Sequence, residues 1–114
     1  MNRSLQLALA CLIAVAAGCV SFQDMRARNA YLKGDLDTAE SLTESALASD
    51  PKDLQARKLG AKIATKRGAD AMEAGDMQKA KTYFDKAVEL NPTDDTAQKA
   101  RDFVDQDLRS RIAD

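Results

Sequence analysis

Apolar residues recur every three or four positions through most of the chain, which is the spacing of one face of an α-helix. Glycine, proline and aspartate divide this pattern at regular intervals, and no segment alternates as a half-buried strand would. The pattern predicts five helices, over about Phe22–Lys33, Leu36–Ser49, Pro51–Ala74, Met77–Leu90 and Pro92–Ile112. The predicted fold class is therefore all-α.

Four of the predicted helices carry residues that we expect to face a core. In chain order these are Ala39, Leu42, Ala46 and Leu47; Ala56, Leu59 and Ile63; Ala80, Phe84, Ala87 and Val88; and Ala97, Ala100, Val104, Leu108 and Ile112. The last helix also has a charged side, which suits a terminal cap with a solvated outer face. That side comprises Arg101, Asp102, Asp105, Asp107, Arg109 and Arg111.

The chain contains an internal repeat, in which one constant shift superimposes a first unit on a second. The shift aligns Ala30, Gly34, Asp35, Ala39, Ala46, Pro51, Asp53 and Ala56 with Ala71, Gly75, Asp76, Ala80, Ala87, Pro92, Asp94 and Ala97. Each glycine is expected to end a helix in the left-handed conformation, and the aspartate after it to cap the next helix. We further predict that Asp50–Pro51 and Asn91–Pro92 begin helices as N-cap and first helical residue.

These helix pairs resemble tetratricopeptide repeats. The second unit, about residues 61–94, has the family's signature residues at Gly68, Ala71, Ala80, Phe84, Ala87 and Pro92. The first unit, about residues 20–53, has Ala27 where the family usually has glycine and Thr43 where it has a bulky aromatic, so we expect looser packing there. The resemblance implies a short α-solenoid of two helical hairpins, closed by a cap helix over about residues 92–112.

The two units are related by a shift of 41 residues, as from Ala30 to Ala71. This period is longer than that of the family, which is roughly 34 residues. The surplus is close to two helical turns. An insertion of that length extends the third helix without rotating its buried face. With two repeats and a cap, the domain lies near the minimum for independent stability, so oligomerisation is also compatible with the sequence.

The N-terminus is typical of a secretory signal. Arg3 precedes an unbroken apolar run from Leu7 to Val20, which is short for a membrane span. The run ends in Ala16-Ala17-Gly18-Cys19, which resembles the lipobox of bacterial lipoproteins. The resemblance implies cleavage before Cys19, attachment of acyl chains such as palmitate there, and, with Val20 next, an outer-membrane location facing the periplasm.

The expected organisation is a lipoprotein signal peptide (1–18), a lipidated cysteine with a short tether (19–21), and a helical domain (22–114). An uncleaved inner-membrane anchor and an ordinary secretory signal are alternative interpretations of the same segment. If Cys19 carries lipid, Val20 alone separates it from Ser21. The tether then spans about 7 Å even when extended, which would hold the domain against the membrane.

Composition excludes several classes of function. Without Arg3, the 16 basic and 18 acidic side chains nearly balance, which argues against a nucleic-acid binder. The chain has no histidine, phosphate loop or metal-spaced cluster, and lipidation would leave no free thiol. The carboxylate pair Asp94–Asp95 suits helix capping better than acid–base chemistry. We therefore predict no catalysis, no cofactor, no metal and no nucleic-acid partner.

The third predicted helix carries an unusual run of basic residues. Lys58, Lys62 and Lys66 are spaced by four and form one cationic stripe. The stripe is compatible with a plain solvated face and with a docking strip for an acidic peptide or anionic lipid heads. In the tetratricopeptide family, first helices line a peptide-binding groove. By resemblance, the predicted groove comprises Asp24, Arg28, Tyr31, Leu32, Lys62, Lys66, Ala69 and Met72.

The sequence thus predicts a lipid-anchored envelope adaptor that binds a protein partner through its helical surface. Two alternatives stay open at this point. In one, the chain is a self-oligomerising structural lipoprotein; in the other, it is an accessory subunit of an envelope secretion, assembly or cell-wall enzyme complex. The fold and the expected cellular location do not by themselves distinguish these functions.

Overall fold

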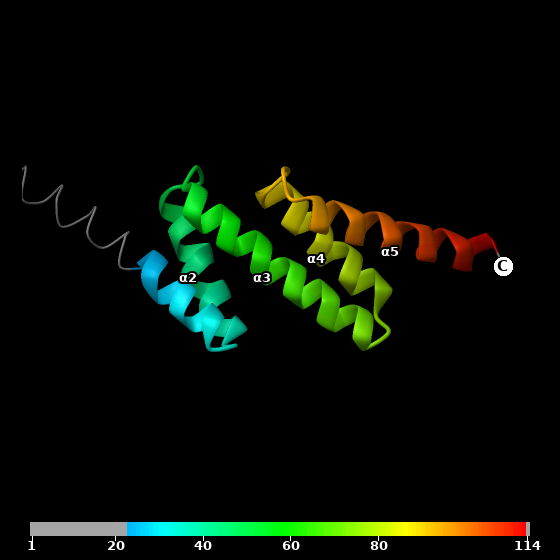
Figure 1. The fold of residues 1–114 in the computed structure, drawn as a ribbon, viewed down its shortest axis with the longest axis horizontal. Coiled ribbons are helices and arrows are strands. Elements are labelled where there is room, and N and C mark those ends of the chain that lie inside the picture. The colour runs from blue at the N-terminus through cyan, green and yellow to red at the C-terminus, as the bar shows by residue number, and fades with distance from the viewer. Residues whose placement is uncertain (1–22, 114) are drawn as a thin grey trace, which may run out of the picture.

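The computed structural model describes residues 23–113. A first helix covers residues 23–32, followed by α2 (Leu36–Ser49), α3 (Leu54–Glu73), α4 (Met77–Leu90) and α5 (Asp95–Ala113), as Figure 1 shows. The described residues contain no strand. This confirms the predicted all-α fold, a short solenoid of two helical hairpins with a C-terminal helix. The predicted start of the first helix at Phe22 and the signal and tether residues lie outside the described part.

α2 and α4 have the predicted bounds, and equivalent residues set their starts. Gly34 and Gly75 have φ values of +81° and +80°, in the region that favours glycine. The aspartate after each caps the next helix: the Asp35 carboxylate accepts from the Thr38 amide at 3.2 Å, and the Asp76 carboxylate from the Lys79 amide at 3.0 Å. The equivalent glycines and aspartates of the two repeats therefore have the same roles at the starts of α2 and α4.

The predicted starts of α3 and α5 were both wrong, and each helix begins slightly later than predicted. Asp53, not Asp50, is the N-cap of α3, and its carboxylate accepts from the amides of Gln55 and Ala56. Asp50 instead ends α2, where its backbone amide donates to the Ala46 carbonyl. Asn91 ends α4 in the same way, and α5 starts at Asp95. An aspartate that binds the amides two and three residues ahead outcompetes the Pro-N1 signal as the helix start.

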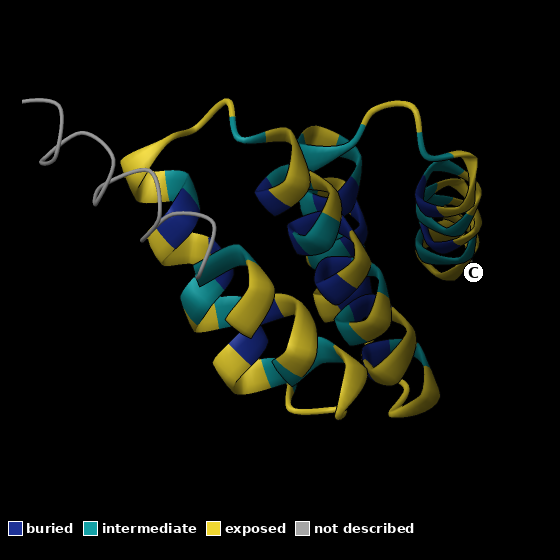
Figure 2. Cartoon of the chain, turned by 60° about the vertical axis from the view of Figure 1, so that its left-hand side comes forward, coloured by how far each residue is buried: buried dark blue, intermediate teal, exposed yellow. Residues whose placement is uncertain are grey.

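The helices form consecutive hairpins with α3 as the central element. α3 packs against α2 on one side and α4 on the other, and α4 packs against α5. Figure 2 shows the buried residues along the facing sides of the helices. One core cluster joins α3, α4 and α5 through Ala61, Ala64, Ala87 and Ala97, and a second through Ala71, Ala80, Phe84 and Val104. The alanines of these clusters allow close approach of the helix axes.

The core differs from the prediction in one added and one missing residue. In α2 Thr43 is buried together with Ala39 and Ala46, at 3 % exposure, although the prediction did not include it. The Thr43 hydroxyl donates to the Ala39 carbonyl at 2.7 Å, so its burial leaves no unpaired donor. Ile112 is 85 % exposed although it continues the apolar stripe of α5. α5 has 19 residues and α4 only 14, so the end of α5 extends past its partner (Figure 1).

α5 is the equivalent of α3 one repeat later. It resembles α3 on one packing face and differs from it on the other, which makes it a terminal cap. The buried residues Ala56 and Ile63 of α3 correspond, one repeat period later, to Ala97 and Val104, which are also buried. The small residues of α3 that meet α4 correspond to charged residues of α5. These pairs are Gly60 and Arg101, Ala64 and Asp105, and Gly68 and Arg109. Another helix therefore cannot pack on α5 as α4 packs on α3.

The extra N-terminal turns of α3 hold the end of α4. Arg57 donates from Nη2 to the Glu89 carbonyl at 2.9 Å and from Nε to the Leu90 carbonyl at 3.2 Å. Its Nη1 also donates to the Pro51 carbonyl at 3.2 Å. The Glu89 and Leu90 carbonyls lie at a helix C-terminus, where they lack intrahelical partners, and a cation there also suits the helix dipole. Arg57 is therefore a structural residue, not a free member of the basic run.

A candidate protein-interaction surface on the first helix and α3

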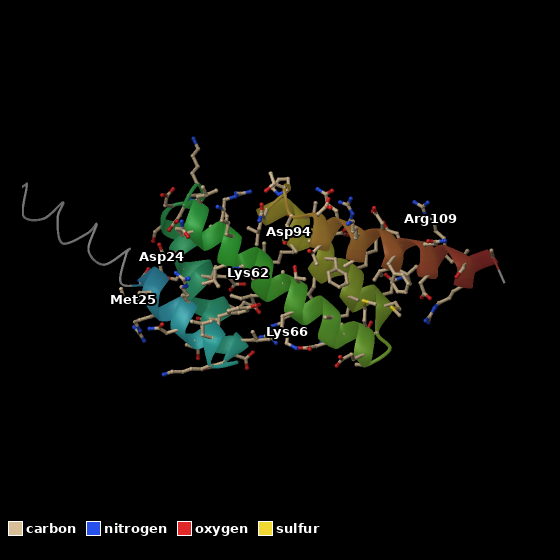
Figure 3. The ribbon with its side chains drawn as sticks, viewed as in Figure 1. Asp24, Met25, Lys62, Lys66, Asp94 and Arg109 are labelled. Atoms are coloured by element: carbon tan, nitrogen blue, oxygen red, sulfur yellow. The ribbon has the colours of Figure 1, made fainter. Side chains whose placement is uncertain are left out.

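The first helix and α3 lie close together at both ends of the first helix. At one end the Asp24 carboxyl approaches the Asp53 carboxylate that caps α3. At the other end Tyr31 makes a small electrostatic contribution to the raised pKa of Lys66. Figure 3 shows Asp24 and Met25 on the first helix and Lys62 and Lys66 on α3. The two helices thus bring together the two halves of the predicted groove.

Two carboxyl groups meet between these helices. Partial burial, a hydrogen bond to Asp53 and repulsion from the Asp53 carboxylate raise the pKa of Asp24 above its ordinary value of 3.8. Asp53 Oδ1 accepts the two amides of the α3 N-terminus, while its Oδ2 is buried without a hydrogen-bond partner among the described residues. The two carboxyl groups therefore repel each other when both are charged.

The basic run of α3 divides into residues with and without internal partners. Arg67 forms ion pairs with Asp37 and with Glu40, the latter at 2.7 Å, so it ties α3 to α2. Lys66 pairs with Asp70 at 3.0 Å, and this contact raises the pKa of Lys66.

Lys58 and Lys62 are exposed, and no ion pair to either is present within residues 23–113. The whole basic run comprises Arg57, Lys58, Lys62, Lys66 and Arg67. Because Arg57 and Arg67 bind groups within the fold and Lys66 pairs with Asp70, fewer of its positive charges are available to a partner than the sequence suggested.

Most residues of the predicted groove are accessible. Arg28, Leu32, Lys62, Lys66 and Ala69 are exposed, and Leu32 has 72 % of its surface accessible.

The other three groove residues, Asp24, Tyr31 and Met72, are half-buried, and Met72 packs against the core cluster around Phe84. The accessible part therefore combines the apolar side chains of Leu32 and Ala69 with cations on both helices, which suits a protein partner better than a small molecule.

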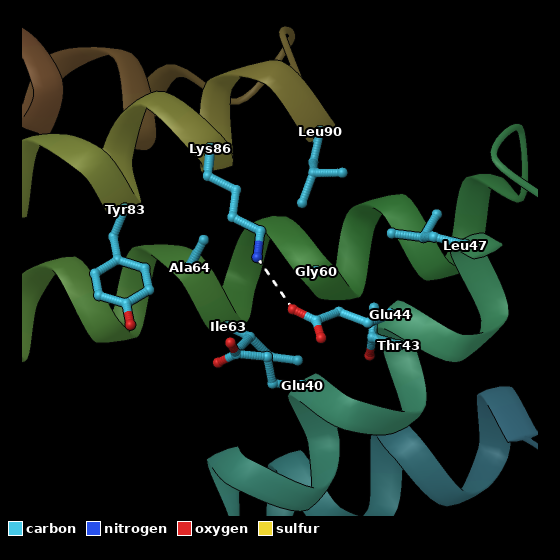
Figure 4. Close-up of a pocket in the computed structure, with 10 residues that line it drawn as sticks. All are labelled: Glu40, Thr43, Glu44, Leu47, Gly60, Ile63, Ala64, Tyr83, Lys86 and Leu90. Carbon is cyan, nitrogen blue, oxygen red and sulfur yellow. Dashed lines mark hydrogen bonds and ion pairs between the residues drawn. The ribbon is translucent and has the colours of Figure 1, made fainter.

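The sequence interpretation did not identify a small space between α2 and α4, which Figure 4 shows. Its floor is α3 and its lining is mostly apolar. Comparing the two repeats position by position gives the signal that could have found it. Thr43 in its wall stands where the second repeat has Phe84, a residue large enough to fill such a gap.

The part of the chain that the structure describes was also searched for a metal-binding cluster and for a membrane-spanning helix. Across residues 23–113, no three histidine, cysteine or acidic residues gather in a way that suits a metal ion. Within the same range, no helix combines the length and hydropathy needed to cross a bilayer.

The tetratricopeptide repeat family model matches residues 61–94, which is the hairpin of α3 and α4. The match begins at Ala61, so it leaves out the N-terminal turns of α3 that carry Arg57. Searches of curated proteins and of solved structures gave no match. Tetratricopeptide repeats are typically non-catalytic interaction modules, so the chain contains a protein-interaction scaffold.

Proposed function

We propose that this chain is a lipid-anchored adaptor of the bacterial cell envelope that binds a protein partner and performs no catalysis. The observation that carries the proposal is the accessible surface of the first helix and α3, next to a tetratricopeptide repeat at residues 61–94. Repeat helices of this kind form extended binding surfaces because each contacts only its neighbours and leaves one face free.

The anchor of this adaptor is Cys19. Its support is the Ala16–Cys19 lipobox-like sequence after a short apolar run. A lipid on Cys19 holds the first helix close to the headgroups, because the tether from Cys19 to Ser21 reaches about 7 Å. We propose the outer membrane, with the domain in the periplasm, as the location.

The partner in this proposal is an envelope protein or peptide. It contacts Leu32 and Arg28 of the first helix and Lys62 of α3, which are three of the accessible members of the predicted groove. The charged outer face of α5 favours this adaptor role over self-stacking of the chain into a longer solenoid. A stacked copy would bury Arg101, Asp105 and Arg109 against a helix.

Metabolic labelling with a clickable fatty-acid probe tests the anchor. The wild-type chain should incorporate the probe and begin at Cys19, and Cys19→Ser should abolish incorporation. Cys11→Ser is the matched control, because Cys11 lies in the signal and leaves with it. Equal labelling of wild type and Cys19→Ser, or a mature protein that retains Met1, would refute lipid anchoring at this residue.

A further inference from the structure

The first helix and α2 form one end of the solenoid, and the first helix has an exposed edge that faces away from α3. Asp24 and Tyr31 lie on its α3 side, where they interact with Asp53 and Lys66. Successive residues of a helix are about 100° apart, so the opposite edge comprises Arg26, Asn29 and Lys33, with Met25 at its border. All four of these residues are exposed. Figure 3 shows Met25 on the side of the first helix away from α3.

α2 continues this edge with a row of hydroxyl side chains. Its α3 side is fixed by Glu40, which pairs with Arg67, and by Thr43, which lies over Gly60. The opposite side of α2 comprises Thr38, Ser41, Ser45 and Ser49, which are all exposed. Together the edges of the two helices form the N-terminal end face of the solenoid.

The acidic side chains of α2 lie away from this end face. Asp37 and Glu40 pair with Arg67 of α3, and Glu44 pairs with Lys86 of α4, as Figure 4 shows for the last pair. Each carboxylate of α2 is therefore directed toward the interior of the solenoid. The side that α2 contributes to the end face is neutral.

Both charged residues of the end face, Arg26 and Lys33, are cations. Lys33 continues the first helix by one residue, since its amide donates to the Asn29 carbonyl at 3.1 Å, and its side chain has no ion pair within residues 23–113. The nearest acids, Asp35 and Asp50, lie in the loops at the two ends of α2, where they accept backbone amides at 3.2 and 3.0 Å. The end face therefore attracts anions, although the chain as a whole is nearly neutral.

The sequence brings this end face next to a lipid-soluble segment. Only Ser21 and Phe22 separate the apolar run Leu7–Val20 from residue 23, at which the described structure begins. Two residues span about 7 Å even when fully extended. The end face is therefore held near the headgroups both when Cys19 carries lipid and when the apolar run is retained.

We propose that the N-terminal end face lies on an anionic phospholipid surface. This proposal rests on the proposed envelope anchor only because the anchor brings this end to the bilayer. Arg26 and Lys33 bind headgroup phosphates, and Met25 enters the boundary between headgroups and acyl chains. The hydroxyls of α2 donate to headgroup oxygens. Because the anchor keeps the face at a high effective concentration of lipid, a weak contact is enough to orient the domain.

This contact sets the orientation of the whole domain. The first helix and α2 lie on the bilayer, α3 and α4 lie above them, and α5 lies farthest from the membrane. Arg28 and Lys62 lie on the groove side and stay accessible, and Leu32 lies at the border between the groove and the end face. The groove then opens sideways just above the headgroups.

Methyl NMR on the full chain in nanodiscs tests the proposal, with a headgroup nitroxide lipid as the distance probe. Threonine methyl labelling supplies a reporter on the end face, Thr38, and a reference on α4, Thr82. Thr38 lies near the end of the first helix that is farther from the apolar run. That helix is about 15 Å long, so Thr38 approaches the bilayer only if the whole face does.

The expected result depends on the lipid. In phosphatidylglycerol nanodiscs, the nitroxide lipid should remove most of the Thr38 signal and leave Thr82 nearly unchanged. In phosphatidylcholine nanodiscs, which lack net charge, the loss at Thr38 should be much smaller. The full chain retains its apolar run, which holds it in the nanodisc. The result is therefore independent of acylation, and absence of lipid on Cys19 would refute only the anchor.

Two variants separate the end face from general attraction of a cation to the bilayer. Lys33→Gln should restore much of the Thr38 signal in phosphatidylglycerol, because it removes a cation from the face. Lys58→Gln is the matched control, since it removes an equally exposed lysine from α3, and it should leave the Thr38 signal weak.

Three results would overturn the proposal: no loss of the Thr38 signal in phosphatidylglycerol, equal losses in the two lipids, or equal effects of Lys33→Gln and Lys58→Gln. A change at Thr38 that follows the number of chains per nanodisc, without nitroxide lipid, would show that the end face pairs with a second copy. That outcome would also refute the lipid contact.

Discussion

A Cβ atom built on Gly68 would lie 2.6 Å from Cε1 of Phe84, closer than real side-chain carbons approach. The Phe84 ring is 2 % exposed and packs in the cluster with Ala71, Ala80 and Val104, so it has no free space to move into. The absence of a side chain at position 68 is therefore what permits an aromatic residue at position 84. The first repeat has the opposite pair, Ala27 and Thr43, and both are buried.

This relationship predicts that Gly68→Ala destabilises the protein. Overpacking should lower the free energy of unfolding by about 1–3 kcal/mol, and the higher helix propensity of alanine should offset roughly 1 kcal/mol of this loss. Gly60→Ala is the matched control in the same helix, because its nearest neighbour is the flexible end of Leu90. Chemical denaturation should show a loss for Gly68→Ala and little loss, or a small gain, for Gly60→Ala. Equal responses would contradict the packing account.

The two repeats also predict a compensating pair. Phe84→Thr alone should cost about 3–5 kcal/mol, as other removals of a buried aromatic do. Combined with Gly68→Ala it recreates the Ala27–Thr43 pair of the first repeat. The double variant should be more stable than the sum of the two single changes implies, by about 0.5–3 kcal/mol. Strict additivity in a double-mutant denaturation cycle would show that positions 68 and 84 do not pack as a unit.

Asp24 gives a prediction for pH. Since its pKa is raised in the folded state, the folded chain binds this proton more tightly than the unfolded chain. The contribution of Asp24 to stability is therefore greatest below the ordinary pKa of 3.8 and falls as pH rises through the folded pKa. Asp24→Asn should raise the melting temperature at about neutral pH, and the gain should shrink as the pH falls below the ordinary pKa of the carboxyl.

Asp37→Asn is the control for this pH effect, because Asp37 pairs with Arg67 and its removal should not stabilise the protein. A melting temperature of Asp24→Asn at neutral pH that equals or falls below wild type would show that Asp24 and Asp53 do not repel each other in the folded state.

Arg57 predicts a further stability difference within the basic run. Arg57→Met should cost about 1–3 kcal/mol, because it leaves the Glu89 and Leu90 carbonyls at the end of α4 without their donor. Lys58→Met is the matched control, since Lys58 is exposed and has no ion pair among the described residues. Thermal unfolding followed by circular dichroism compares the two. A loss of the same size in both variants would argue against a capping role for Arg57.

The sequence predicted the fold well where local chemistry decides it. α2 and α4 lie between a positive-φ glycine with its capping aspartate and an Asx residue, and all of these signals are local. The starts of α3 and α5 were misplaced because two local signals competed, proline at N1 and aspartate at the N-cap. Ile112 was misassigned because its exposure depends on where α4 begins, which the pattern of α5 alone does not contain.

The candidate surface was only partly predictable. Helical spacing correctly placed Lys62 and Lys66 on an exposed face of α3. The pairing of Arg67 with α2 and of Arg57 with the end of α4 depends on contacts between segments far apart in the sequence, which a one-dimensional pattern does not show. The space between α2 and α4 is lined by Thr43, which is smaller than Phe84, its equivalent in the second repeat. Such a space can be recognised only when the positions of the neighbouring helices are known.

Site-specific photo-crosslinking in cells tests the adaptor account most directly. A photoreactive residue at Leu32 or at Lys62 should capture the same envelope protein, and one at Gln78, exposed on α4, should not. Cys19→Ser should abolish both crosslinks by releasing the domain from the membrane. Capture of different proteins at Leu32 and Lys62, or crosslinks of equal strength at Gln78 or after Cys19→Ser, would contradict a membrane-held partner site on the first helix and α3.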